Sequence, residues 1–247
     1  KHVKVKRIEG GEPSDSFCAR GVVFSNQLVH KSMRKSISDP RILLLGCAVE
    51  YERGSRFVSL ANHSKTERDY LPIAADRILN ERPDVVLLEK AMARQAQEIL
   101  RQAGISVVLN VKRQVLERIS DLTGAAIVQS VELLGGGGQC VSVWGGRFRA
   151  LSLSTRALPL LCVDAPVDNT AYSTIILRGP SGKGHQLDRV KAVVLHALYA
   201  QCCLFGEAAF LAGVGASVPP SYYLESTGEM LAQDSEKPPD GASADPP

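Results

Sequence analysis

The sequence lacks the patterns that mark zinc sites, nucleic-acid surfaces and membrane spans. None of its six cysteines forms a Cys-x-x-Cys pair and no histidine lies at ligand spacing in a paired motif, so we expect no metal. Aromatic residues make up only 5% of the chain and no basic run is interleaved with them, so we expect no nucleic-acid partner. The longest apolar stretch, residues 192–205, is interrupted by His196 and Gln201. Because roughly 20 apolar residues are needed to span a bilayer, we expect no direct membrane insertion.

The chain also lacks a strong charge imbalance and a signal peptide. Its net charge of +3 over 247 residues is close to neutral, and no strongly polyanionic partner follows from that balance. Several cysteines stand inside apolar runs, as reduced core cysteines do, and no signal peptide precedes the first predicted strand. We therefore predict a cytoplasmic protein, with enough apolar residues (45%) for one large domain or two small ones.

The middle of the chain alternates short apolar runs with amphipathic segments. The apolar runs are bounded by turns, which is typical of strands buried on both faces. The predicted strands cover residues 41–50, 84–89, 105–109 and 125–128, and the predicted helices cover residues 66–80, 91–103 and 112–123. Strands that alternate with helices pair in parallel through right-handed crossovers, so we predict an α/β fold with parallel strand–helix units.

A second group of predicted strands flanks this unit and forms an added β-sheet. They cover residues 1–8, 19–24, 140–144, 148–153, 158–163 and 172–177, whereas residues 25–38 and 51–64 are predicted to be irregular and residues 135–138 to form a glycine loop. A long apolar helix is predicted at residues 188–209, with His196 as a core histidine. Residues 215–247 are polar and rich in proline, and we expect a disordered tail there.

Motifs for catalysis are weak or missing. Residues 179–184 follow a predicted strand and precede a helix, as a phosphate-binding loop does, but only two residues separate Gly179 from Gly182-Lys183. A Walker motif has four residues there and a Ser or Thr after the lysine, so we predict a plain turn. The sequence also lacks the Asp-Phe-Gly and His-Arg-Asp motifs of protein kinases. We predict no catalytic residue and no cofactor for this chain.

The helix predicted at residues 112–123 has the most distinctive polar face. Its polar residues lie on the first turns, opposite an apolar face: they are Lys112, Arg113, Gln114, Glu117 and Arg118, with Val115, Ile119 and Leu122 on the other side. Two interpretations remain open, an exposed face that is only solvated and a face that binds a partner.

Several segments, in order, resemble the apical domain of group II chaperonins and the related domain of PIKfyve-type phosphatidylinositol 3-phosphate 5-kinases. They are residues 5–24 with Gly10-Gly11 and Gly21-Val22-Val23, residues 29–33, 42–50, 84–100, 104–111 and 123–125, and Ile175-Ile176-Leu177-Arg178-Gly179. Each segment alone is weak, but their order and spacing are specific. Arg178-Gly179 is the fold marker, and Pro180 departs from the glycine usual in the family.

Three details resemble the kinase branch more than the chaperonins. Val49-Glu50-Tyr51 follows the buried strand, residues 111–120 are similar to the kinase version, and the connection from Tyr51 to Thr66 is too short for the helical protrusion that closes a chaperonin cavity. The Gly-Asp-Gly-Thr-Thr nucleotide motif of the chaperonin equatorial domain is missing from the sequence.

The resemblance implies an apical-like domain at residues 19–165 and an intermediate-like segment made of residues 1–18 and 166–214. It implies a non-catalytic docking module, in a parent kinase that uses ATP and magnesium to make phosphatidylinositol 3,5-bisphosphate. The implied partners are a protein scaffold and the opposing lipid phosphatase, at the cytosolic face of endosomal or vacuolar membranes. In chaperonin apical domains the helices similar to residues 90–103 and 112–123 line the substrate-binding surface. The candidate partner-binding residues are therefore Lys112, Arg113, Gln114, Glu117 and Arg118.

Two rival interpretations stay open. The chain is similar enough to chaperonins to be the substrate-binding apical domain of a cytosolic group II subunit. An unrelated small α/β enzyme would instead need a polar pocket at the carboxyl ends of the strands, near Glu89 and Asn110.

Overall fold

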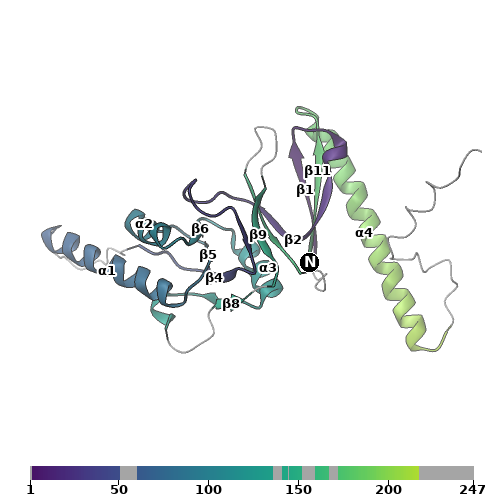
Figure 1. Ribbon diagram of the computed structural model, residues 1–247. Helices are drawn as coiled ribbons and strands as arrows, with labels where there is room; N and C mark the ends of the chain where they lie inside the picture. The colour runs from purple at the N-terminus through teal and green to yellow at the C-terminus, as the bar shows by residue number, and fades with distance from the viewer. Residues whose placement is uncertain are drawn as a thin grey trace, which may run out of the picture. The chain divides into compact units, whose positions relative to one another are not determined.

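A computed structural model describes residues 2–50, 60–135, 141–143, 145–151, 159–166 and 172–216, with backbone only for residues 60–69 and 143 (Figure 1). The chain divides into two compact units, residues 1–192 and residues 193–247, which we describe separately. The predicted tail at residues 215–247 lies outside the described residues from 217 onward.

The centre of the first unit is a parallel sheet with strand order β6-β5-β4-β7. Its strands are β4 (Arg41–Leu45), β5 (Val85–Leu88), β6 (Ser106–Val108) and β7 (Ile127–Val128), and β8 (Val141–Val143) pairs antiparallel with β4. The predicted parallel strand–helix units are thus confirmed. The first strand is shorter than predicted: it ends at Leu45, and its last hydrogen bond to β7 is donated by the backbone N–H of Gly46 to the Val128 carbonyl at 2.8 Å.

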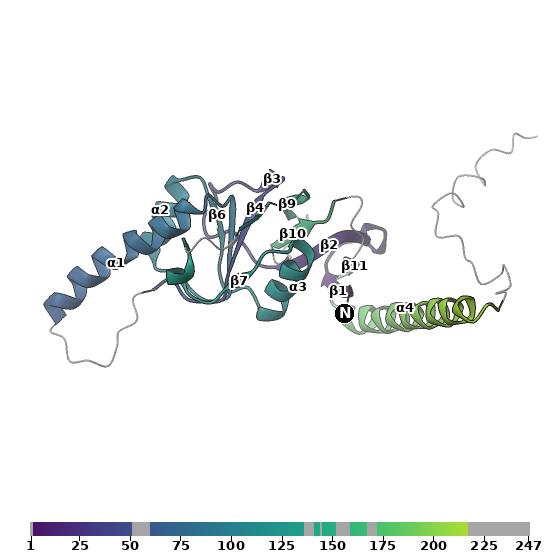
Figure 2. The same ribbon diagram turned by 90° about the horizontal axis from the view of Figure 1, so that it is seen from below.

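Both faces of the parallel sheet are buried, which explains why its strands are continuous apolar runs. Ile42 and Leu44 point into one core, shared with helix α3 (Arg113–Thr123) and the second sheet. Leu43 and Leu45 point into the other, shared with α1 (Leu60–Asn80) and α2 (Arg94–Gln102). Figure 2 shows α1 and α2 together on one side of the sheet and α3 on the other.

The second sheet has six strands in the order β1-β11-β2-β10-β9-β3. They are β1 (Val3–Glu9), β2 (Phe17–Ser25), β3 (Ser36–Ser38), β9 (Arg147–Leu151), β10 (Leu160–Asp164) and β11 (Ser173–Gly179). Strands β1 and β11 pair in parallel, and the other neighbours are antiparallel. The added sheet was predicted, but β3 lies within residues 25–38, which we had predicted to be irregular.

Strand β2 changes partner at Gly21. It pairs with β11 up to Arg20 and with β10 from Gly21 onward. Gly21 has a φ of 131°, and a Cβ there would lie 2.1 Å from the carbonyl oxygen of Val163, so the bend requires glycine. The fully buried Thr174 hydroxyl closes the break by donating to the Gly21 carbonyl at 2.9 Å and accepting from the Val23 N–H at 3.3 Å. This change of partner is close to the predicted boundary between residues 18 and 19, and the domain division itself stays a prediction.

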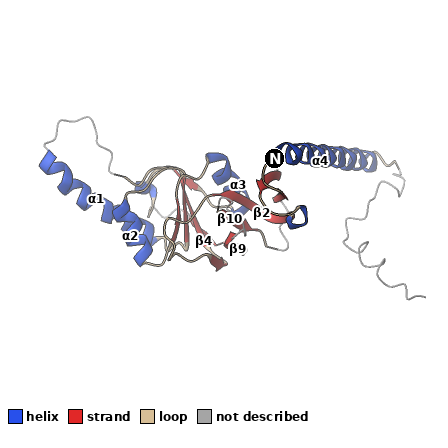
Figure 3. Ribbon diagram, turned by 90° about the horizontal axis from the view of Figure 1, so that it is seen from above, coloured by secondary structure: helices blue, strands red, loops and turns tan. Residues whose placement is uncertain are grey.

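Helix bounds differ from the predicted ones mainly at the amino ends. Helix α1 begins at Leu60 instead of residue 66, so the predicted short connection is reduced to residues 51–59, which lie outside the described residues. Helix α2 begins at Arg94 instead of residue 91, because Met92 first forms a β-bridge with Val49. Figure 3 shows the helices in blue against the red strands. Helices α2 and α3 end where predicted, at Gly104 and Gly124, which have φ of 76° and 73°.

Helix α4 (Gly184–Gly213) runs from the first unit into the second. Among the helices of the described residues it alone is long and apolar enough, by length and composition, to cross a membrane, with a mean hydropathy of 1.4. Core helices of soluble proteins pass the same test, so this is weak evidence. The helix was predicted at residues 188–209, but it was not counted as a possible span because His196 and Gln201 interrupt its apolar run. The predicted core positions are wrong here, since His196, Cys202 and Cys203 are exposed.

Candidate docking surface

Helix α3 is held on the body by one continuous apolar face. Its buried residues are Val115, Leu116, Ile119, Leu122 and Thr123. The end of the helix is fixed by side chains, since Thr123 donates to the Ile119 carbonyl at 2.7 Å and Ser120 donates to the Ala125 carbonyl at 2.7 Å. The five predicted partner-binding residues therefore lie on a rigid element, as the amphipathic pattern indicated.

Two of the five predicted residues, Arg113 and Glu117, form an ion pair with each other, and Arg113 also pairs with Glu89 just after β5. The Arg113 guanidinium lies 3.2 Å from the Glu89 carboxylate and 3.1 Å from the Glu117 carboxylate. These hydrogen bonds, with Glu117 first and Glu89 second, raise the pKa of Arg113. Arg113 and Glu117 thus help to fix α3 against the end of β5, and Glu89 is a structural partner rather than a pocket residue.

Arg118 is half-buried rather than free. Its guanidinium lies 5.5 Å from the ring centroid of Tyr172, and one terminal nitrogen donates to the His2 carbonyl at 3.5 Å. Burial lowers the pKa of Arg118, and its Nε is buried without a hydrogen-bond partner. Tyr172 is fixed in turn by its hydroxyl, which donates to Asp121 at 3.0 Å.

The remaining two residues, Lys112 and Gln114, are exposed. Lys112 is the N-cap of α3 and makes no side-chain cap. The predicted set is therefore brought together on one helix but divides by environment: Lys112 and Gln114 are free for contact, Glu117 is exposed but paired, and Arg113 and Arg118 have internal contacts. No observation tests whether a partner binds there, so the assignment stays a prediction.

Two lysines that the sequence argument did not single out lie near the same helix. The pKa of Lys4 is lowered by burial and by the positive charges of Arg118, Lys112 and Lys191. Burial and the charges of Lys4, Arg118 and Lys112 lower the pKa of Lys6 to about 8. Residues 1–8 were predicted as a strand, but no sequence signal showed that α3 and α4 would place three further cations near it.

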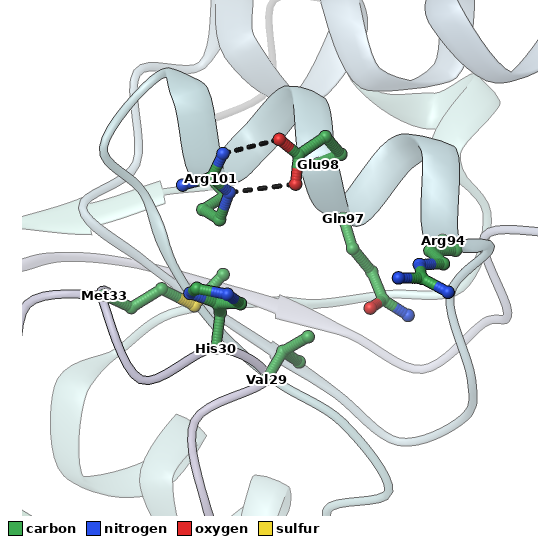
Figure 4. A pocket seen from close by; sticks show the side chains of 7 residues that line it. All are labelled: Val29, His30, Met33, Arg94, Gln97, Glu98 and Arg101. Atoms are coloured by element: carbon green, nitrogen blue, oxygen red, sulfur yellow. Dashed lines mark hydrogen bonds and ion pairs between the residues drawn. The ribbon is translucent and has the colours of Figure 1, made fainter.

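A pocket of about 440 Å³ lies along α2 (Figure 4). It is lined from one side by the segment after β2 and from the other by α2, with the residues Val29, His30, Met33, Arg94, Gln97, Glu98 and Arg101. Two of its charged side chains pair with each other. Arg101 donates to Glu98 at 2.5 and 2.8 Å, and these bonds lower the pKa of Glu98 to about 2. This pocket is lined in part by the helix predicted at residues 91–103, which resembles a helix of the chaperonin substrate-binding surface.

A second, polar pocket of about 460 Å³ lies at the carboxyl ends of β4 and β7, on either side of the point where the strand order reverses. An enzyme of this fold class would place its ligand there. The lining residues are Gly46, Cys47, Ala48, Glu50, Tyr70, Lys90, Gln129, Ser130, Val131 and Glu132. Neither Glu89 nor Asn110, the residues named for an enzyme, lines it.

The glycine loop at residues 179–184 forms a hydrogen-bonded turn. The Lys183 N–H donates to the Pro180 carbonyl at 3.3 Å, and Gly182 has a φ of 83°. The fold marker beside it has a clear structural role. Arg178 is 5% exposed, its side chain donates to the Gly10 carbonyl, and its backbone N–H donates to the Ser16 hydroxyl at 3.0 Å. A Cβ on Gly11 would lie 2.6 Å from the guanidinium, which explains the Gly10-Gly11 turn.

Reactive chemistry is not concentrated anywhere in the described part of the chain. Those residues contain no group of three or more His, Cys, Asp or Glu side chains that could hold a metal ion. The buried thiol of Cys162 donates to Asp164 at 2.8 Å, and burial is the main reason that its pKa is raised. A thiol in such a place is a poor nucleophile.

These features define a chaperonin-type domain, and the chain belongs to the TCP-1/cpn60 chaperonin family, whose sequence model matches residues 1–221. An open-state monomer of a group II chaperonin from Methanococcoides burtonii has the same fold, with a TM-score of 0.64 and 25% identity. The similarity covers 80% of this chain and 43% of that chain.

Sequence relatives include lipid kinases and chaperonin subunits. The 1-phosphatidylinositol-3-phosphate 5-kinase FAB1A of Arabidopsis thaliana is 36% identical over 226 residues, which cover 88% of this chain and 13% of the kinase. The T-complex protein 1 subunit gamma of Tetrahymena pyriformis is 34% identical over 140 residues, 53% of this chain and 25% of that subunit. The resemblance to the chaperonin-like region of these 5-kinases is therefore confirmed, and the chain spans a small fraction of their length.

Proposed function

We propose that this chain is a non-catalytic protein-interaction domain that regulates a phosphatidylinositol 3-phosphate 5-kinase. The observation that supports this is the 36% identity to such a kinase over 88% of the chain. In the described residues, Lys112, Gln114 and Glu117 of α3 are exposed, which suits contact with a partner. The catalytic step, with ATP and magnesium, belongs to another part of the parent.

The partners that fit this role are a protein scaffold and the opposing lipid phosphatase, at the cytosolic face of endosomal or vacuolar membranes. The parent would make phosphatidylinositol 3,5-bisphosphate there. The docking surface centres on Lys112 and Gln114, because these two of the five predicted residues are exposed and, in the described part of the chain, form no side-chain hydrogen bond or ion pair.

A second candidate function is the apical domain of a chaperonin subunit. It is supported by the similarity to a T-complex protein 1 subunit and by the shared fold with a group II chaperonin. The match to that subunit covers 53% of this chain, against 88% for the kinase, so we rank it second. Sequencing the gene on both sides of this segment separates the two. A downstream lipid-kinase domain supports the first, and an ATP-binding equatorial half on both sides supports the second.

The docking role is tested with two substitutions on α3 and one control substitution on α2. We expect Gln114→Arg, on α3, to weaken capture of the scaffold by the purified chain, because a long side chain on a rigid helix face blocks close approach. Lys112→Glu, at the exposed start of the same helix, should weaken it as well.

Gln95→Arg is the matched control, because Gln95 is an exposed glutamine on α2. It should leave capture of the scaffold unchanged. All three variants should melt within a degree or so of the parent, since exposed substitutions change stability little. If scaffold capture survives Gln114→Arg and Lys112→Glu but fails with Gln95→Arg, the docking surface lies on α2 and our assignment is wrong.

A further inference from the structure

Five cationic side chains from three separate elements gather in one place. Lys4 and Lys6 come from β1, Lys112 and Arg118 from α3, and Lys191 from the first turns of α4. We call these five residues the basic cluster. Lys4 and Lys6 lie two residues apart on one face of β1. Arg118 joins α3 to this strand, because it donates to the carbonyl of His2, just before β1, at 3.5 Å. The ion pair between Arg7 of β1 and Asp188, one turn before Lys191, joins α4 to it. The lowered pKa values of Lys4 and Lys6 agree with this arrangement.

In the described part of the chain, no member of the basic cluster forms an ion pair. The polar contacts of its members are weak and neutral: the Lys6 ammonium donates to the Ser25 hydroxyl at 3.4 Å, and Arg118 donates to the His2 carbonyl at 3.5 Å. Elsewhere on the same helix, Arg113 has two carboxylates.

Partial burial makes this arrangement unfavourable for the free protein. Lys4, Lys6, Arg118 and Lys191 are all partly buried, and the Nε of Arg118 is buried without an acceptor. Burial removes water that would stabilise each charge, and like charges that share a site repel one another. An anion from outside would relieve both effects at once.

The start of α3 adds to the same field. Lys112 is its N-cap and supplies no side-chain acceptor to the first turn. The helix amino end carries a partial positive charge and unpaired N–H groups. Lys112 therefore adds a side-chain charge at this helix start.

We propose that the basic cluster binds a compact anion that carries several phosphate groups, either a free inositol phosphate or the headgroup of a phosphorylated lipid. A phosphate group brings a charge of about −1.5 to −2 with three acceptor oxygens, so two or three phosphates on one ring match five crowded cations. Glutamate or aspartate side chains bring one charge each and are spaced along a peptide, which matches the crowding less well. This inference goes beyond the docking function and does not require a protein partner.

The test uses the full 247-residue chain. Inorganic pyrophosphate and a soluble inositol bisphosphate are titrated by calorimetry into the parent, into Lys4→Glu/Lys112→Glu, and into Lys31→Glu/Lys35→Glu. The last is the matched control, since Lys31 and Lys35 are exposed, lie outside the cluster and give the same change of net charge. We expect the parent and the control to bind, with affinity falling as salt is added, and the cluster variant to bind at least about tenfold more weakly.

Vesicles decide the source of the phosphate groups. Co-sedimentation with phosphatidylcholine vesicles, with and without phosphatidylinositol 3-phosphate, supports a lipid headgroup if only the phosphorylated vesicles retain the chain. Binding of the soluble inositol bisphosphate without retention on vesicles supports a free metabolite. If the cluster variant fails to fold, Lys112→Gln, which removes one exposed charge, takes its place with a smaller expected loss.

Three results would overturn the proposal: no binding of any phosphate probe, equal binding by the cluster variant and the control, or binding of polyglutamate in preference to the phosphate probes. Gln114→Arg separates this proposal from the docking function, because it keeps all five cations. Loss of scaffold capture with intact phosphate binding in that variant supports both proposals as separate functions. Intact capture with intact phosphate binding removes the support for docking at Gln114 and leaves the phosphate proposal standing.

Discussion

The paired strands β1 and β11 place two kinds of cation side by side. Near one end, Arg178 is buried and its guanidinium is matched by the carbonyl of Gly10. Further along, Lys4 and Lys6 are partly buried, and among the described residues their ammonium groups form one hydrogen bond, from Lys6 to the Ser25 hydroxyl. Burial alone therefore does not distinguish a structural cation from a binding one.

The comparison of Arg178 with Lys4 and Lys6 indicates that the partner of a buried charge decides its role. A guanidinium that donates to a backbone carbonyl holds a turn together, and its removal leaves that carbonyl without a donor. An ammonium that lies among other cations supplies no such hydrogen bond to hold the fold together. Removing it should cost little stability and should cost ligand binding instead.

The largest effect is expected for the matched cation. Arg178→Ala leaves the buried Gly10 carbonyl unsatisfied and removes the contact with Gly11, so we expect a loss of at least about 1–3 kcal/mol in the free energy of unfolding. Urea unfolding measures it. Arg189→Ala, at an exposed arginine of α4, is the control and should change stability little. Equal stability of the two variants would show that Arg178 does not hold the turn.

An intermediate effect, of opposite sign, is expected for the unmatched lysine. The folded-state pKa of Lys6, about 8, lies below its ordinary value of 10.5. Between those two values the unfolded chain holds more protons than the folded one, so the contribution of Lys6 to the free energy of unfolding rises as pH increases from about 8 to 10.5. Below pH 8 the charged amine destabilises the fold by a constant amount.

Lys6→Gln removes this contribution. Unfolding free energies of the parent and of Lys6→Gln, measured near pH 7 and near pH 10, should therefore converge or reverse in the parent's favour at the higher pH. Other groups that titrate in this range, such as Cys47 and Tyr172, are common to both proteins and drop out of the difference. A difference that does not change with pH would contradict the crowding of Lys6.

The smallest effect is expected on α2, where the charges are exposed and paired. Glu98→Gln breaks the pair with Arg101, but both side chains reach solvent, and exposed pairs contribute little because water and salt screen them. We expect a melting temperature almost unchanged at neutral pH, with the small change shrinking further at high salt. A loss as large as that of Arg178→Ala would mean that α2 depends on its surface charges.

The sequence predicted the parts of the fold that repeat. Val115, Ile119 and Leu122 follow helical periodicity and are buried as expected. The parallel strands were recognisable as short apolar runs because both of their faces are covered. The start of α1 at Leu60 was missed because the residues before position 66 show no apolar period. Strand β3 was missed because it has only three residues.

The candidate site was predicted only in part. The five polar residues of α3 were found from one helix, but periodicity shows which side chains share a face and not which of them a neighbouring element occupies. Glu89 reaches Arg113, and Tyr172 covers Arg118, through contacts made across long sequence separations. Lys4 and Lys6 of β1 lie near cations of α3 and α4, which are far away in the sequence. The net charge of +3 does not indicate where cations lie close together.

The most direct test of this account is the pKa of the Lys6 amine, measured by nuclear magnetic resonance on the full chain labelled at its lysine side chains. The account predicts a value near 8 in the free protein, against an ordinary value of 10.5, and an increase when inorganic pyrophosphate is added. Lys31, which is exposed and outside the cluster, should show no change with pyrophosphate. A Lys6 pKa near its ordinary value that pyrophosphate does not move would contradict the claim that unmatched cations crowd at β1 and α3.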